Sequence, residues 1–182
     1  MTSSFGYGSI SAQNLNRTFP KVTIIPDADI VYMTLALEEA RAAAAAGEVP
    51  IGAVLVVDGS IIGRGHNQRE NWQDPTAHAE MIAIRGAAET LHSWRLLDST
   101  LYVTMEPCVM CVGAAILARI KRLVFAVRDP KAGACGSIFN IPEERRLNHR
   151  LEVSVGILEQ ESRELLQEFF SSLRKKPIQA GL

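Results

Sequence analysis

The pattern of hydrophobic residues near the start of the chain predicts one long helix. Apolar side chains recur at helical spacing over residues 27–46 and lead into a run of alanines. Asp27 or Asp29 can cap the beginning of this helix, and Gly47 and Pro50 are typical of its end. We therefore expect the folded body of the chain to begin with a helix at about residue 27.

The next hydrophobic runs predict an antiparallel hairpin. Residues 51–57 and 60–64 are rich in β-forming side chains, and Asp58-Gly59 lies between them. This pair is preferred in two-residue hairpin turns because both turn residues need positive φ. Residues 65–75 are polar and are expected to form a loop.

The rest of the chain alternates between helical and strand-like patterns. The predicted elements are a helix over 77–91 capped by Thr76, a strand over 100–104, a helix over 108–119 with Pro107 in its first positions, strands over 122–127 and 151–155, and a last helix marked by Leu165, Leu166, Phe169, Phe170 and Leu173.

Strands that alternate with helices indicate an α/β fold with a mixed sheet of about five strands between two helical layers. The strands over 100–104 and 122–127 should be parallel, because the helix between them returns the chain to the same end of the sheet. In such folds, ligands bind where helices begin beside the ends of strands.

Composition narrows the class of protein. The chain has 182 residues, of which 47% are hydrophobic, so it can form a core without a disulfide or a structural metal. Its 19 basic and 20 acidic residues exclude a strongly basic nucleic-acid coat, and any contact with nucleic acid must come from a local patch. The odd count of three cysteines suits a reducing compartment better than a disulfide framework.

We expect one domain over residues 27–176, followed by a short tail over 177–182. Residues 1–26 lack Asp and Glu, have no apolar core of signal-peptide type, and are interpreted as a disordered leader. An organellar transit peptide is the alternative, and the expected location is otherwise the cytoplasm. A membrane span is not expected, because the longest apolar run, residues 31–46, contains three charged side chains.

Two separated motifs carry candidate chemistry. Cys108 and Cys111 lie three residues apart at the start of a predicted helix, where the helix dipole favours the thiolate form that binds metals. His78 and Glu80 lie about thirty residues earlier, and residues i and i+2 of a helix do not share a face. We therefore expect His78 to bind the metal and Glu80 to reach a water on the same ion.

This His-x-Glu and Pro-Cys-x-x-Cys combination is the signature of zinc-dependent nucleobase deaminases. Two thiolates and one imidazole leave one position of a tetrahedral zinc open to water, which is typical of catalytic zinc. The alternative is a structural zinc with a fourth protein ligand, for which the candidates are Cys135, His66, His92 and His149. A redox function of Cys108 and Cys111 is a further alternative.

Several segments, in order, make the chain resemble the bacterial tRNA-specific adenosine deaminases. They are EVPIGAV (48–54), GRGHN (63–67), DPTAHAE (74–80), TLYVTMEPCVMC (100–111), RDPKAG (128–133) and LNHR (147–150). The resemblance implies a three-layer α/β/α cytidine deaminase-like fold, one Zn²⁺ per subunit and a homodimer. It also implies that the partner is the anticodon stem-loop of a tRNA, expected to be an arginine tRNA, whose wobble adenosine becomes inosine.

The resemblance also implies roles for individual residues. His78, Cys108 and Cys111 would hold zinc, and Glu80 would move protons while zinc-bound hydroxide attacks C6 of adenine. Asn67 and the backbone of Ala79 would hold the base, and Asp129, Lys131 and Phe170 would lie near the flipped nucleotide and the anticodon loop. The alternatives are a deaminase of free bases or nucleosides, of guanine or cytosine type, and a noncatalytic RNA-binding subunit.

Overall fold

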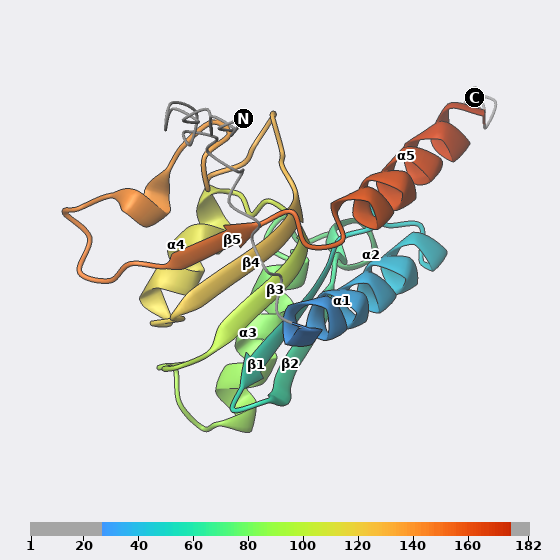
Figure 1. Ribbon diagram of the computed structural model, residues 1–182. Coiled ribbons are helices and arrows are strands. Elements are labelled where there is room, and N and C mark those ends of the chain that lie inside the picture. The colour runs from blue at the N-terminus through green and yellow to red at the C-terminus, as the bar shows by residue number, and fades with distance from the viewer. Residues whose placement is uncertain (1–26, 176–182) are drawn as a thin grey trace, which may run out of the picture.

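The computed structural model describes residues 27–175, and these form a single five-stranded sheet with helices on both faces (Figure 1). The predicted leader over residues 1–26 and the tail over 177–182 lie outside the described residues, as does residue 176. In chain order the helices are α1 (Asp27–Ala45), α2 (Arg69–Trp72), α3 (Ala79–Thr90), α4 (Val109–Leu117), the 3₁₀ helix η1 (Ile141–Glu143) and α5 (Glu159–Lys175). The strands are β1 (Gly52–Val57), β2 (Ser60–His66), β3 (Thr100–Met105), β4 (Arg122–Val127) and β5 (Glu152–Val155).

The sheet has the order β2-β1-β3-β4-β5 and is mixed, as predicted. β1 pairs antiparallel with β2 and β3, whereas β3, β4 and β5 run parallel. Asp58 and Gly59 both have positive φ, which explains the tight β1–β2 turn. The parallel pairing of β3 and β4 follows from the α4 crossover between them.

Alternate residues of the central strands supply two separate cores. On β3, Leu101 and Val103 pack toward α3 and α4, whereas Tyr102 packs toward α1. The helices α1 and α5 cover one face of the sheet, and α3 and α4 cover the other, as Figure 1 shows. This arrangement confirms the three-layer α/β/α fold.

Local details of the elements differ from the sequence-based predictions. β2 continues to His66, so the predicted polar loop is shorter, and it contains the one-turn helix α2. β5 begins one residue later than expected, at Glu152. β2 is longer than predicted because its backbone pairing with β1 continues to the Gly52–His66 pair. The side-chain pattern alone does not reveal this pairing.

Candidate functional site

One edge of the sheet gathers the segments that carry the candidate site. Because β1 runs antiparallel to β2 and β3, the beginning of β1 lies at the same edge as the ends of β2 and β3. β4 is parallel to β3 and ends there too. The helices α3 and α4 begin near this edge, each following a strand or loop that leads out of it. Residues that are distant in sequence therefore meet at this edge.

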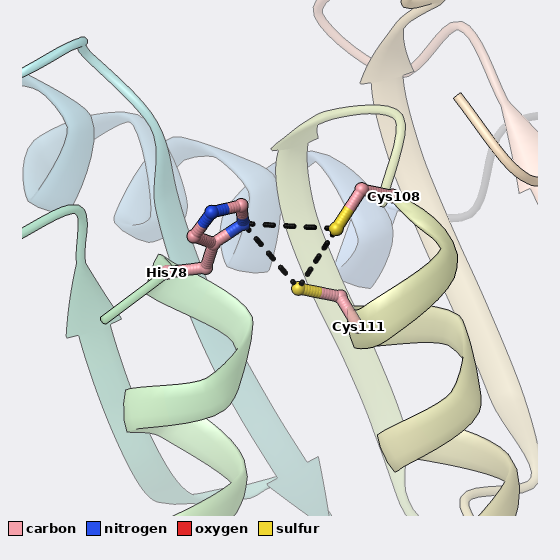
Figure 2. Close-up of side chains that lie close together, drawn as sticks. All are labelled: His78, Cys108 and Cys111. Carbon is pink, nitrogen blue, oxygen red and sulfur yellow. Dashed lines mark hydrogen bonds between the residues drawn. The ribbon is translucent and has the colours of Figure 1, made fainter. Parts of the chain in front are cut away.

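His78, Cys108 and Cys111 converge on one point (Figure 2). The Nδ1 atom of His78 lies 3.8 Å from Sγ of Cys108 and 3.6 Å from Sγ of Cys111. The two sulfur atoms are 3.7 Å apart. Figure 2 shows the imidazole directed from the beginning of α3 toward the sulfur atoms at the beginning of α4. The structure thus brings together the three ligands that the spacing suggested.

The starts of both helices differ from their predicted positions. Thr76 does not cap α3, because its backbone N–H and its hydroxyl both donate to Oδ1 of Asp74. The capping position belongs to His78, whose backbone is extended, and the helix begins at Ala79. The predicted start of α4, at residue 108, was also too early.

In α4, Cys108 occupies the capping position with an extended backbone, and the helix runs over Val109–Leu117, so Pro107 lies before it. The predicted helix over 108–119 was therefore too long at both ends. The extended backbones of His78 and Cys108 let their side chains project beyond the helix ends.

The three ligand atoms have the spacing that zinc requires. A tetrahedral zinc, with Zn–S bonds of about 2.3 Å and Zn–N bonds of about 2.0 Å, holds two sulfurs about 3.8 Å apart and each sulfur about 3.5 Å from the nitrogen. The observed distances of 3.6 to 3.8 Å agree with this geometry. Within residues 27–175, the group of side chains able to hold one metal ion has these three members. A set of three protein ligands is typical of catalytic rather than structural zinc.

The other cysteine and histidines considered as a fourth ligand have different surroundings. Cys135 is buried in the core beneath α3 and α4, where burial raises the pKa of its thiol to about 12. His66 contacts Glu39 and Gln68, with Nδ1 2.9 Å from a Glu39 carboxylate oxygen. His149 Nε2 lies 2.6 Å from the carbonyl oxygen of Ile120. Neither these residues nor His92 belongs to the metal-binding group.

The pKa values of the three side chains in the cluster depend on one another. The hydrogen bond between the two sulfur atoms lowers the pKa of the Cys108 thiol to about 3, against the effect of burial. The same hydrogen bond and burial raise the pKa of Cys111. The hydrogen bond with Cys108 raises the pKa of the His78 imidazole. Metal binding requires deprotonated cysteines and a neutral imidazole, so loading the site with zinc releases protons.

Glu80 lies in the first turn of α3 and is 4% exposed. Burial raises the pKa of its carboxyl, although its own backbone N–H opposes the effect. Glu80 lines the same pocket as His78 and Cys108 but is not a member of the metal-binding group. A carboxyl group with a raised pKa beside a metal site is suited to general acid and base chemistry.

A pocket of about 410 Å³, here called the central pocket, opens over the cluster. Its wall contains five of the residues singled out from the sequence: Asn67, Glu80, Asp129, Lys131 and Phe170, together with the candidate metal ligands His78 and Cys108. The remaining lining residues are Val49, Ile51, Arg69, Met105, Glu106, Pro130 and Ala132. The pocket is large enough for a nucleobase and combines apolar walls with a few polar groups.

Ala79 and Cys111 do not line the central pocket. Ala79 is fully buried, and a Cβ atom added at Gly65 would lie only 2.4 Å from the carbonyl oxygen of Ala79. The backbone group of Ala79 left for a ligand is its N–H, because first-turn N–H groups of a helix have no acceptor within the helix. Cys111 is buried, with only 1% of its surface exposed.

Sequence reasoning assigned no role to Glu106, which organises one wall of the pocket. Its carboxylate is 3% exposed and accepts hydrogen bonds from the backbone N–H groups of Asp129, Cys135 and Ser137 at 2.9 to 3.1 Å, and from the Ser137 hydroxyl. Burial alone would raise the pKa of Glu106, but these donors lower it. The available signal was an acidic residue at the end of an apolar strand, which must be paired if buried.

The comparisons with known proteins agree with this geometry. The family model of the MafB19-like deaminases matches residues 27–174. A tRNA-specific adenosine deaminase of Bacillus subtilis is 51% identical over 148 residues, which cover 81% of this chain and 92% of that protein. The chain belongs to the tRNA-specific adenosine deaminase family.

Solved structures of other deaminases share the fold. One, from a study of A-to-I editing by tRNA:A34 deaminases at the wobble position, is 47% identical, with a TM-score of 0.72 over 75% of this chain and 99% of that one. A guanine deaminase from Nitrosomonas europaea is 28% identical, with a TM-score of 0.67 over 85% of this chain and 89% of that one. The family likeness and the structural neighbours confirm the predicted cytidine deaminase-like fold and the assignment as an adenosine deaminase.

Proposed function

We propose that this protein is a zinc-dependent hydrolase that converts the wobble adenosine of a tRNA to inosine and releases ammonia. The observation that carries the proposal is a zinc-compatible set of His78, Cys108 and Cys111 next to a nucleobase-sized pocket that the buried carboxyl of Glu80 lines. The 51% identity to a tRNA-specific adenosine deaminase supports the choice of substrate.

Zinc held by these three residues, one ion per subunit, supplies a Lewis acid that makes water a nucleophile at neutral pH. Glu80 accepts the proton of the attacking water and delivers it to N1 of adenine. It then takes the proton of the new hydroxyl at C6 and passes it to the departing amine, so that adenosine and water yield inosine and ammonia. Because Glu80 is buried beside the ligands, it can transfer protons without contact with bulk solvent.

We assign the recognition of the nucleotide to the rest of the central pocket and to the backbone at the start of α3. Asn67 and the backbone N–H of Ala79 bind the base, and Asp129 and Lys131 contact the flipped nucleotide and its neighbours. Phe170 is 42% exposed at the pocket wall and offers an aromatic face for stacking. An anticodon loop is single-stranded, so extruding its base costs only a few kcal/mol. We expect an arginine tRNA in the cytoplasm to be the substrate.

We also propose that two copies form a homodimer through the outer face of α3 and α4. Trp94 and Leu117 border one shallow apolar hollow there, and they are 54% and 71% exposed. Exposed large apolar side chains that lie together are typical of protein interfaces.

Across the described residues, no helix has the length and apolar character needed to cross a bilayer.

Inosine formation by the wild type and by a Glu80 variant tests substrate and mechanism together. Wild-type protein should form inosine in an anticodon stem-loop that contains a wobble adenosine, measured by mass analysis of the nucleosides. Glu80→Gln should lower the rate by about 10²- to 10⁴-fold while zinc content stays unchanged, because only the proton carrier is lost. A wild-type protein that leaves the stem-loop unchanged but releases ammonia from free guanine would be a guanine deaminase instead.

A further inference from the structure

A second buried carboxylate lies close to the site without facing the metal ligands. Glu48 follows the end of α1 and is 1% exposed. One of its oxygens accepts the backbone N–H of Asn71 at 2.8 Å, and the other accepts the side-chain nitrogen of Asn67 at 3.0 Å. Burying a carboxylate costs free energy unless hydrogen bonds satisfy its oxygens, as these two donors do.

This pairing determines which way the Asn67 amide faces. An amide has a donor end and an acceptor end, whereas an ionised carboxylate offers only acceptors. With Glu48 on one side, Nδ2 of Asn67 must point toward Glu48, and Oδ1 points away. A neutral glutamine at position 48 would not enforce this, since it has both a donor and an acceptor.

The carbonyl oxygen of Asn67 is available to a ligand. Within residues 27–175, no donor contacts Oδ1 of Asn67, and the one side-chain polar atom that is both fully buried and unpaired is the hydroxyl of Ser162. Oδ1 is therefore reached by solvent, although the residue as a whole is only 4% exposed. The opening it faces is the central pocket, which Asn67 lines.

We propose that Glu48 is a positioning residue that orients Asn67 to present a hydrogen-bond acceptor to the target nucleotide. The substrate must then offer a donor at that place, such as a ribose hydroxyl or the exocyclic amine of adenine. This inference rests on the proposed function, because it assigns the acceptor to the same central pocket. It adds to that function which end of the Asn67 amide faces the substrate. It also names Glu48, which lies outside the pocket wall, as the residue that determines this orientation.

Exchanging the two side chains tests the pairing. In E48Q, the carbonyl of the new glutamine still accepts from Asn71, so its amide nitrogen faces Asn67, and Asn67 turns its own nitrogen toward the substrate. We expect kcat/KM on the anticodon stem-loop to fall by about 10- to 100-fold. In N67D, two carboxylates face each other, and kcat/KM should fall as well. In E48Q/N67D, the glutamine donates to one oxygen of the aspartate, and the other oxygen again faces the pocket as an acceptor.

The double variant should therefore exceed both single variants by at least about tenfold in kcat/KM, since it restores every hydrogen bond and the net charge. Glu38→Gln, the same change at an exposed position of α1, is the matched control and should keep wild-type activity. Wild-type kcat/KM in E48Q, or a double variant no better than the poorer single variant at full zinc content, would overturn the proposal. If E48Q does not fold, comparing N67D with E48Q/N67D decides the matter.

The failure of the proposed function would look different. A wild-type protein that forms no inosine rejects the substrate, and the pairing is then judged by the thermal stabilities of the same four proteins. An Asn67–Glu48 pair predicts that the double variant melts higher than the sum of the single changes allows. Additive changes in melting temperature would reject the pairing independently of any substrate.

Discussion

At the scale of single residues, the two cysteines of the proposed metal site lie where a helix begins. Cys108 caps α4, and Cys111 lies in its first turn, so both sulfurs are near backbone N–H groups that have no partner within the helix. The positive end of the helix dipole stabilises thiolates there. The site is thus prepared for a divalent metal by the local backbone as well as by the identity of its ligands.

Removing one of these sulfurs should abolish metal binding. We expect Cys111→Ser to retain almost no zinc after dialysis, whereas the wild type holds about one equivalent, because two ligands bind zinc far more weakly than three. Cys135→Ser is the matched control, since Cys135 is also buried but lies outside the metal-binding group. Zinc is measured by elemental analysis of the purified proteins. Equal zinc in the two variants would contradict the assignment of Cys111 as a ligand.

At the scale of elements, the approach of α3 to β2 sets the position of His78. Gly65 lies on β2 directly against the first turn of α3, where an added Cβ would lie 2.4 Å from the carbonyl oxygen of Ala79. Real side chains do not make such contacts, so a larger residue must push the helix away from the sheet. Because His78 immediately precedes Ala79, this close packing also brings the imidazole within reach of the cysteines.

Two glycine-to-alanine substitutions compare a glycine in close contact with a neighbouring helix and a glycine with open space around it. Gly65→Ala should lower the free energy of unfolding by about 1–3 kcal/mol through overpacking. Gly86→Ala should raise it by up to about 1 kcal/mol, because Gly86 lies within α3 with open space around its Cα. Urea denaturation measures both. A Gly65→Ala protein as stable as Gly86→Ala would show that the helix is not held by this contact.

At the scale of the whole molecule, one polar cluster joins the α1 layer to the sheet. Asp29 is 2% exposed and accepts two hydrogen bonds of 2.7 Å from Arg122 of β4 and one of 2.8 Å from the hydroxyl of Tyr102. Arg122 also donates to Ser154 of β5. The hydrogen bonds from Arg122 hold the pKa of Asp29 below its usual value, although burial opposes them.

This cluster should make stability depend on pH. Since the folded state lowers the pKa of Asp29, its contribution is present above the ordinary value of 3.8 and is lost as pH falls through the lower, folded value. Asp29→Asn should therefore cost on the order of 2 kcal/mol at pH 7, a value reduced because Arg122 is a quarter exposed, and less at pH 3. Urea denaturation of wild type and variant at several pH values measures this difference.

The exposed pair of Glu159 and Arg163 on α5 provides the control. Glu159→Gln should change the free energy of unfolding by no more than a few tenths of a kcal/mol at either pH, because water screens an exposed pair. If Asp29→Asn and wild type differed equally at pH 7 and pH 3, the contribution of Asp29 would not depend on its charge.

The sequence by itself determined the features that depend on residues close together along the chain. The Asp58-Gly59 turn, the helical and strand periodicities, and the three-residue spacing of Cys108 and Cys111 depend on local backbone preferences, which the chain expresses wherever it folds. The matching segments, read in order, also identified the family. Helix starts were less accurate, because the turn from Asp74 to Thr76 competes for the same backbone groups as a helix cap.

Only the tertiary structure decided which distant groups meet. His78 reaches the cysteines, Glu48 reaches Asn67, and Glu106 reaches the segment that begins at Asp129, because strands β1 to β4 end or begin at one edge of the sheet. A buried acid shows in a sequence only as an acidic residue, and its partners are chosen by the packing of segments that lie far apart along the chain. The sequence therefore shows which side chains are present, whereas strand order and register determine which of them pair.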